Sequence, residues 1–205
     1  MRDSVPSGAV VSCHCERPLD DAVWRRFDAL QRARPGGLDV IALIRPPDPE
    51  YGEDEAVWLE RARTAAARAP LGLHTHWTSP THARPTGGDP AERVRREVAW
   101  MRERGLEPRY FCGGGWYTDK EVEASVQELG LTDCTPRGGY PREGVLPTTH
   151  SLGGLVRGVF LTGLPLFVHA YFHDHDLLDP GRRWALQAAL RLLGLRRDEY
   201  LHVRQ

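Results

Sequence analysis

Three short apolar runs in this chain of 205 residues each end in side chains of the kind that bind metal ions. The ligand-type residues at these three ends are His14 and Glu16, His74 and His76, and His169 and His173. In a β-strand, residues two apart point to the same face, so both members of a pair are expected to converge. A parallel α/β sheet or barrel gathers its functional groups at the carboxyl ends of its strands. The pattern therefore predicts an α/β architecture and a single polar site.

Further strands are expected to alternate with helices along the chain. The order of the segments favours a parallel α/β arrangement over a sandwich or a helical bundle. The strands are expected at residues 9–15, 38–44, 71–75, 109–113, 131–134 and 166–172. Polar, turn-rich segments follow several of them, at 45–52, 77–88 and 137–151. In a barrel these segments lie on the catalytic face and shape a substrate groove.

Capping residues mark the helix boundaries. An aspartate followed by a proline, at residues 89–90 and again at 179–180, predicts a helix start. Thr118 with Glu121 three residues later predicts a capping box at the start of another helix. The helices are expected to bury four tryptophans: Trp24, Trp58, Trp100 and Trp184.

Composition narrows the class of protein. The length and hydrophobic content suit one domain over residues 1–205. The net charge of −1 and the scattered arginines argue against nucleic acid as a partner. No apolar stretch has membrane-spanning length and the amino terminus lacks a secretory pattern, so we expect a cytoplasmic protein with no membrane partner. The expected partner is a small-molecule or oligosaccharide substrate, and the oligomeric state is left open.

Two of the three strand ends are predicted to hold a divalent metal ion, with zinc as the expected identity. Neutral imidazole and carboxylate are its usual ligands. We predict His74, His76 and, from the first strand, His14 as the ligands. The alternative is that the paired histidines are hydrogen-bonded polar residues in a barrel mouth. Glu16 is predicted to be catalytic. Burying a carboxylate without a cation costs free energy, so a buried Glu16 would lie beside the metal ion. The alternative is that Glu16 is exposed to solvent. The thiols of Cys13 and Cys15 fall on the opposite strand face and are expected to pack as small hydrophobic groups.

The third strand end offers a general acid. His169, Tyr171 and His173 share one face of this strand. We predict that His173, oriented by Asp174 or Asp176, protonates a leaving group. The competing interpretation is a turn and capping segment before the last helix.

Aromatic residues beside two of the strand ends suggest a surface for a sugar ring. Trp77, Trp116 and Tyr117 are predicted to bind substrate by stacking, although tryptophans also close the ends of barrels. The three consecutive glycines at 113–115 lack the spacing and the lysine of a phosphate loop, which argues against nucleotide binding.

Four segments resemble the motifs of the polysaccharide deacetylase (NodB homology) family of metal-dependent carbohydrate de-N-acetylases and amidases. These segments are VVSCHCE at 10–16, LGLHTH at 71–76, FCGGGW at 111–116 and FHDHDL at 172–177, and they occur in the family's order. The resemblance implies a distorted (β/α) barrel, similar to a TIM barrel but with fewer than eight repeats. It also implies a zinc-type ion and hydrolysis of the C–N bond of an acetamido group.

The chain departs from the family pattern at residues that carry chemistry. The paired aspartates of the first motif correspond to His14 and Cys15, and the nearest carboxylate is Glu16. The family's arginine corresponds to Cys112, which we place among the substrate-binding residues.

The second histidine of the family's metal pair also differs. Its position would fall on Thr78, so His76 or the more distant His82 stands in for it.

Three functions follow from these observations. The first is removal of an acyl group from an N-acylated sugar or glycoconjugate, with Glu16 or His14 taking a proton from water and His173 protonating the departing amine. The second is a catalytically degenerate barrel that binds carbohydrate or a partner protein without turnover. The third is another hydrolase of the His-x-His type, such as a phosphoesterase.

Overall fold

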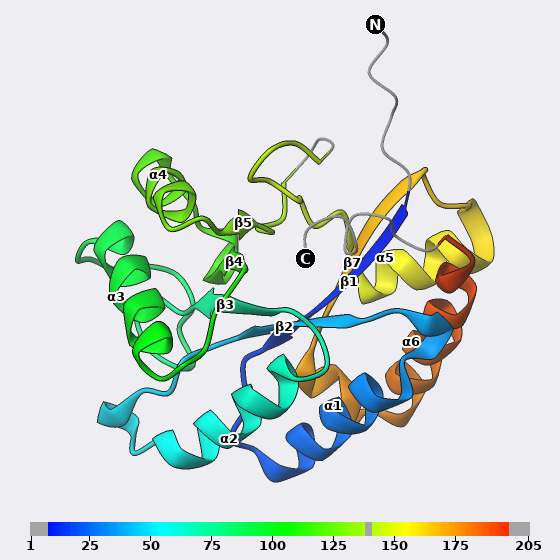
Figure 1. Ribbon diagram of the computed structural model, residues 1–205. Coiled ribbons are helices and arrows are strands. Elements are labelled where there is room, and N and C mark those ends of the chain that lie inside the picture. Colours follow the sequence, from blue (N-terminus) through cyan, green and yellow to red (C-terminus); the bar gives the residue numbers. More distant parts are fainter. Residues whose placement is uncertain (1–7, 138–140, 197–205) are drawn as a thin grey trace, which may run out of the picture.

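A curved sheet of parallel strands forms the centre of the computed structural model, which describes residues 8–137 and 141–196 (Figure 1). In these residues the sheet has seven strands, in the order β5-β4-β3-β2-β1-β7-β6, and every pairing between neighbours is parallel. The strands are β1 (Gly8–Cys15), β2 (Val40–Ile44), β3 (Leu71–Thr75), β4 (Tyr110–Gly113), β5 (Thr132–Asp133), β6 (His150–Ser151) and β7 (Phe167–His173). The predicted distorted barrel with fewer than eight repeats is confirmed.

Helices lie along the outer side of this sheet (Figure 1). They are α1 (Asp21–Ala33), α2 (Glu55–Ala66), α3 (Pro90–Glu103), α4 (Lys120–Glu128), α5 (Leu152–Arg157) and α6 (Pro180–Leu193). Short 3-10 turns, η3 (Gly114–Trp116) and η5 (Asp174–Leu178), follow β4 and β7. Among the described residues, none of the helices combines the length and apolar character that crossing a bilayer requires.

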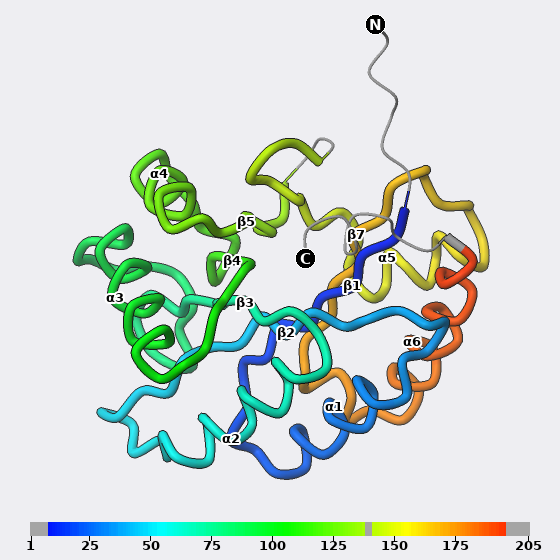
Figure 2. The backbone as a smooth tube through the Cα atoms, in the orientation of Figure 1, coloured from blue at the N-terminus to red at the C-terminus, as the bar shows by residue number. Residues whose placement is uncertain are grey.

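The chain crosses the sheet in a simple order. From β1 to β5 each new strand is added on the same side, and β7 then pairs with the free side of β1 (Figure 2). β1 is therefore an interior strand of the sheet, with β2 on one side and β7 on the other. In this register His14 of β1 is paired with His173 of β7, and His74 of β3 is paired with Cys112 of β4. The register brings residues distant in sequence to one level of the sheet.

Strand alternation separates an outer core from an inner one. Val11, Cys13 and Cys15 of β1 belong to the main hydrophobic cluster, together with the helices. Val10, two residues before Ser12 on the other face, belongs to a smaller cluster with residues of β2, β4 and β7. Cys13 and Cys15 are fully buried free thiols, as expected of small hydrophobic groups.

The capping predictions hold for two helices and are wrong for a third. Asp89 and Asp179 cap α3 and α6 by accepting backbone N–H groups three residues on, at 3.0 and 2.8 Å. α4 is capped by Asp119, which accepts the N–H of Val122 at 2.8 Å. Within residues 8–137 and 141–196 the hydroxyl of Thr118 is buried without a partner, because the carboxylate one residue later reaches the helix terminus instead.

The prediction that all four tryptophans are core residues is wrong for Trp184. Trp58 is fully buried, whereas Trp184 is 71% exposed. The buried face of α6 contains Leu186, Ala189 and Leu190, and a residue two positions before Leu186 lies on another side of the helix. Residues 138–140 of the expected 137–151 loop and the amino-terminal residues 1–7 lie outside the described residues.

Candidate metal centre

One oxygen of Glu16 lies at the meeting point of three imidazoles. Glu16 directly follows β1, and its Oε1 is 3.4 Å from Nε2 of His74 and 3.4 Å from Nε2 of His76. Nε2 of His173, at the end of β7, lies 3.7 Å from the same oxygen. Donors about 2.0–2.2 Å from a shared tetrahedral ion lie about 3.4 Å from one another. The carboxylate oxygen therefore lies at the separation that a zinc-type ion requires from each of the first two imidazoles, and the three ligating atoms lie within 4.8 Å of one another.

Backbone carbonyls fix the orientation of both paired imidazoles. Nδ1–H of His74 donates to the carbonyl oxygen of Cys112 at 3.1 Å, and Nδ1–H of His76 donates to that of Pro80 at 2.9 Å. Because a carbonyl only accepts, each Nδ1 carries the proton and each Nε2 presents a lone pair toward Glu16. Nε2 of His76 is buried and has no hydrogen-bond partner among the residues that the structure describes. Metal-binding histidines are held in this way by partners of their second nitrogen.

The charges at this centre also favour a cation. Partial burial raises the pKa of Glu16, but its contacts with the imidazoles of His74 and His76 outweigh burial and hold that pKa below its ordinary value. Burial lowers the pKa of His74 and outweighs the opposing effect of the Glu16 carboxylate. An ionised carboxylate thus faces the neutral imidazole of His74 at 3.4 Å, and a positive ion between the two groups would stabilise this arrangement.

The predicted ligand His14 lies in a deeper layer. Its side chain is fully buried and stacks on the ring of His74 at 4.7 Å between centroids. Its Nε2 is 3.7 Å from Sγ of Cys112. Ligating atoms within 4.8 Å of one another form two sets, Glu16 with His74 and His76, and His14 with His74 and Cys112. The structure thus brings all the predicted ligands together but places Glu16, rather than His14, in a set with His76.

His173 stands on the other side of the carboxylate. Its side chain is 27% exposed, and its backbone N–H donates to Oδ2 of Asp176 at 2.9 Å. The same carboxylate oxygen lies 3.9 Å from Nδ1 of its ring. Asp174 instead accepts the backbone N–H of Arg17 at 2.8 Å. Of the two aspartates proposed to orient His173, Asp176 is therefore the one beside its imidazole. Burial lowers the pKa of His173, opposed by the charges of Glu16 and Asp176.

His169 shares the strand face of His173 but has different partners. It is fully buried, its Nε2 accepts the hydroxyl of Ser12 at 2.9 Å, and its Nδ1–H donates to the carbonyl of Leu146 at 3.0 Å. Burial lowers its pKa to about 4. Both ring nitrogens are thus engaged inside the barrel, and neither is available to the metal centre.

The predicted aromatic residues separate into two groups. Trp116 is 38% exposed, has a left-handed backbone (φ 60°), and places its ring edge-on to His14 at 5.4 Å between centroids. Trp77 is buried, with its indole N–H donating to the carbonyl of Gly114 at 3.1 Å, and Tyr117 packs against it. Trp116 therefore lies against the histidines, whereas Trp77 and Tyr117 pack against each other.

Tyr171 is a residue of the centre that sequence reasoning did not select. Its ring stacks on the other side of His14 at 5.0 Å and meets Trp116 edge-on at 5.1 Å. The sequence held one indication of this position, because Tyr171 alternates with His169 and His173 on the same strand.

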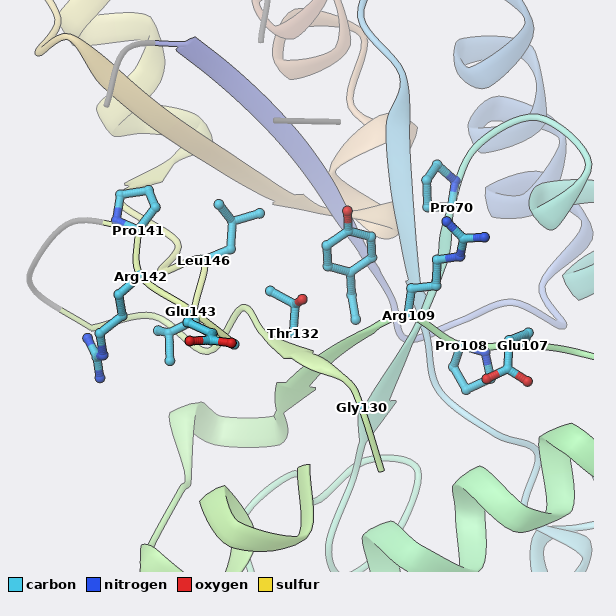
Figure 3. Close-up of a pocket in the computed structure, with 13 residues that line it drawn as sticks. Pro70, Glu107, Pro108, Arg109, Gly130, Thr132, Pro141, Arg142, Glu143 and Leu146 are labelled. Carbon is cyan, nitrogen blue, oxygen red and sulfur yellow. The ribbon is translucent and has the colours of Figure 1, made fainter. Parts of the chain in front are cut away.

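Two hollows lie at different ends of the sheet. One of about 390 Å³ opens beside His173 and is also lined by Tyr171, Asp176 and Arg182. A larger one of about 740 Å³ lies at the amino ends of β3 to β5, where its lining includes Pro70 and Thr132 (Figure 3). Because the imidazoles gather at the carboxyl ends of the strands, the smaller hollow is the one that adjoins the candidate metal centre, through His173 and Tyr171.

Comparison with solved structures identifies the fold. A chitin deacetylase from the fungal pathogen Colletotrichum lindemuthianum superposes with a TM-score of 0.63 at 14% identity, over 94% of this chain and 85% of that one. A family 4 carbohydrate esterase (CE4) from Streptomyces lividans gives 0.55 at 13% identity, over 94% and 88%. A CE4 pseudoenzyme from Bacillus anthracis gives 0.62 at 9% identity, over 92% and 60%. No family model and no curated protein matches the sequence. The chain therefore has the fold of the CE4 polysaccharide deacetylases.

Proposed function

We propose that this protein is a metal-dependent hydrolase that removes the acyl group from an N-acylated sugar or glycoconjugate. The observation that carries the proposal is the Glu16 carboxylate oxygen 3.4 Å from Nε2 of both His74 and His76, at the carboxyl ends of the strands. The likeness in fold to a chitin deacetylase and a carbohydrate esterase supports the choice of substrate. Fold alone does not specify chemistry, so the donor set is the stronger support.

Glu16, His74 and His76 would hold the ion. A bound zinc-type ion lowers the pKa of a water molecule and polarises a carbonyl oxygen. Since three protein donors leave a coordination position free, the set has the composition of a catalytic rather than a structural zinc site. In this assignment Glu16 is a metal ligand. The role in proton transfer that the sequence suggested for it must therefore belong to another residue.

We assign these proton transfers to His173. Its Nε2 faces the centre, 3.7 Å from Glu16, and the lowered pKa favours the neutral imidazole that accepts a proton. Nε2 takes a proton from the attacking water and returns it to the nitrogen of the breaking C–N bond, which leaves as an amine. Asp176 lies beside Nδ1 and stabilises the imidazolium formed between the two steps.

The surroundings suit a sugar substrate. The 390 Å³ hollow leads to His173 and contains the exposed guanidinium of Arg182, which pairs with Asp176 at 2.6 Å. Trp116 is exposed enough to offer part of its indole to a sugar ring. Trp77 and Tyr117 would act only indirectly, by supporting the turn that carries Trp116.

The test combines metal content with turnover. Protein stripped of metal and reloaded with zinc is assayed for acetate release from oligomers of N-acetylglucosamine. Wild type and His82→Ala, which removes an exposed loop histidine, are expected to retain zinc and activity. His76→Ala is expected to lower zinc affinity and turnover at least about tenfold, because it removes a ligand. Wild type without stoichiometric zinc, or a His76→Ala variant equal to wild type, would show the proposal to be wrong.

A binding protein without turnover is the second candidate. The fold is shared with a CE4 pseudoenzyme, and Cys112, at the position of the family's arginine, is fully buried and has no contact with solvent. This function predicts calorimetric binding of the same oligosaccharides in the presence of a chelator, with no acetate released after zinc is added. Turnover in the first assay would exclude it.

A further inference from the structure

A second set of metal-type donors lies directly beneath the first. It comprises His14, His74 and Cys112, and none of the three is more than 1% exposed. We propose that this inner set is a binding position for a thiophilic cation, of the class of Cd²⁺ or Cu⁺, and that it excludes an ion from the outer set of Glu16, His74 and His76. The evidence for this inner site does not depend on the proposed hydrolysis, although the two donor sets share His74.

The separation of the inner donors matches a shared ion. Nε2 of His14 is 3.7 Å from Sγ of Cys112. A tetrahedral ion about 2.0 Å from nitrogen and about 2.3 Å from sulfur places those two atoms about 3.5 Å apart. The ligating atoms of all three residues lie within 4.8 Å of one another. Little movement is therefore needed for the set to close on an ion.

His14 lacks the hydrogen bonds that a purely structural histidine would make. In the described part of the chain its Nδ1 is buried without a hydrogen-bond partner, and its Nε2 has only the sulfur, a weak hydrogen-bonding atom, within hydrogen-bonding distance. His169, in contrast, has both nitrogens bonded to protein oxygens. The stacked rings of His74 and Tyr171 hold the imidazole of His14 in place. The ring is thus oriented toward the thiol, and in the described residues its nitrogens make no hydrogen bond to a protein oxygen.

His74 makes the two sets mutually exclusive. Its Nδ1–H donates to the carbonyl of Cys112, which leaves Nε2 as the nitrogen with a lone pair to offer an ion in either set. One Nε2 lone pair serves one ion at a time. The outer set offers oxygen and nitrogen, whereas the inner set offers sulfur and nitrogen, and soft cations prefer thiolate. When the cation binds, the S–H bond of Cys112 breaks, the bond from sulfur to the cation forms, and the proton leaves to solvent.

Cadmium titration of the full chain tests the inner set. Thiolate-bound Cd²⁺ gives an ultraviolet charge-transfer absorption, which is expected to saturate at about one equivalent in wild type. Cys112→Ser is expected to lose this band. Cys134→Ser is the matched control, because Cys134 is an equally buried thiol of the same inner cluster but is outside the donor set. Glu16→Gln is expected to keep the band, since Glu16 belongs only to the outer set.

Four results would overturn the proposal: no band in wild type, a band that survives Cys112→Ser, a band lost in Cys134→Ser, or a band lost in Glu16→Gln. Cadmium NMR of wild type reports sulfur ligation directly, so the proposal stays testable if Cys112→Ser does not fold. Glu16→Gln separates the two sites. Loss of zinc and turnover with the cadmium band kept supports both proposals. If Glu16→Gln keeps zinc and turnover, the proposed outer site is wrong and the inner site is unaffected. If Glu16→Gln loses the cadmium band, the proposed inner site is wrong.

Discussion

The buried histidines of this protein differ in what their two ring nitrogens contact. His74 and His76 bind backbone carbonyls through Nδ1 and turn Nε2 toward Glu16. His169 places Nδ1 and Nε2 on Leu146 and Ser12. An imidazole with one nitrogen fixed and one open can bind an ion, whereas an imidazole with both nitrogens fixed contributes to stability alone.

His169 gives the stability of the protein a defined dependence on pH. Burial lowers its pKa to about 4 in the folded protein, against about 6.5 in an unfolded chain. Between these values the unfolded state binds more protons, so the free energy of unfolding falls as the pH falls. The loss is about 1.4 kcal/mol per pH unit, or about 3 kcal/mol in total, and it is complete below pH 4.

Urea unfolding of wild type and His169→Gln between pH 4 and 7 measures this effect. Glutamine can donate to one neighbour and accept from the other, and it does not titrate. The difference in unfolding free energy between the two proteins is expected to shrink toward pH 4. An NMR titration that finds His169 protonating near pH 6.5 in the folded protein would contradict the assignment.

The sequence was sufficient to predict that the ligand-type residues lie at one site. It was insufficient to predict which of them form the outer set and which form the inner set. The spacing of His74 and His76 predicted that they share a face, and the structure agrees. The carbonyl partners of these rings belong to β4 and to a loop, and no local pattern specifies such contacts. The burial of Trp77 is likewise set by tertiary packing, which is not visible in a residue's immediate neighbours.

At the scale of elements, helix α3 fixes the end of β3. Thr75 lies between the two paired histidines, and its hydroxyl donates to Glu97 of α3 at 2.7 Å. Glu97 also accepts from Nε of Arg93 at 2.8 Å, and Arg93 donates to the carbonyl of Trp77 at 2.8 Å. Burial raises the pKa of Glu97, and the charge of Arg93 opposes this. The network ties the strand segment that carries His74 and His76, the proposed metal ligands, to one helix.

Removal of the Glu97 carboxylate should destabilise the fold. Glu97→Ala leaves Thr75 and Arg93 without their buried acceptor, at an expected cost of roughly 2–4 kcal/mol. Glu97→Gln keeps one acceptor and should cost less. Glu103→Ala, at an exposed glutamate on the same helix, is the control and should change stability by less than about 0.5 kcal/mol. Equal urea midpoints for Glu97→Ala and Glu103→Ala would show that the network contributes nothing.

Element boundaries were predictable where a side chain determines them locally. Asp89 and Asp179 each precede a proline and cap their helices as expected. At α4 two candidate caps, Thr118 and Asp119, are adjacent, and the choice between them depends on geometry that spacing does not encode. β6 has two residues and exists through pairing with β7, so no periodicity could reveal it.

At the scale of the whole molecule, the residues of the candidate metal centre come from parts of the sheet that are not neighbours. Glu16 follows β1 and the paired histidines end β3, while β2 lies between these strands. A bound ion would therefore link β1 to β3 across β2 and stabilise the folded state.

Zinc is expected to raise the thermal unfolding temperature. At a free concentration of 100 times its Kd, a ligand of the folded state adds about 2.7 kcal/mol. For a chain of this size that corresponds to about 5–10 °C. Calorimetry with zinc and with a chelator measures the difference, and Glu16→Gln should reduce it. Identical unfolding temperatures in the two conditions would argue against a metal centre joining these strands.

The alternation of strands and helices was sufficient to predict the α/β barrel, because each segment carries its own pattern of apolar residues. The 740 Å³ hollow at the amino ends of the strands was not predicted (Figure 3). It is bounded by the starts of β4 and β5 and by residues 141–146, which are brought together only by the curvature of the sheet. Curvature arises from the whole sheet and has no signature in any one segment.

The two edge strands of this open sheet affect whether the protein aggregates at high concentration. Both marginal strands, β5 and β6, have two residues. The outer side of β5 is already occupied, because the N–H of Asp133 donates to Gly144 and its carbonyl accepts from Leu146, each at 2.8 Å. In the described residues a strand from another molecule would thus find almost no ladder to extend, so the open barrel resists edge-to-edge aggregation without having to close.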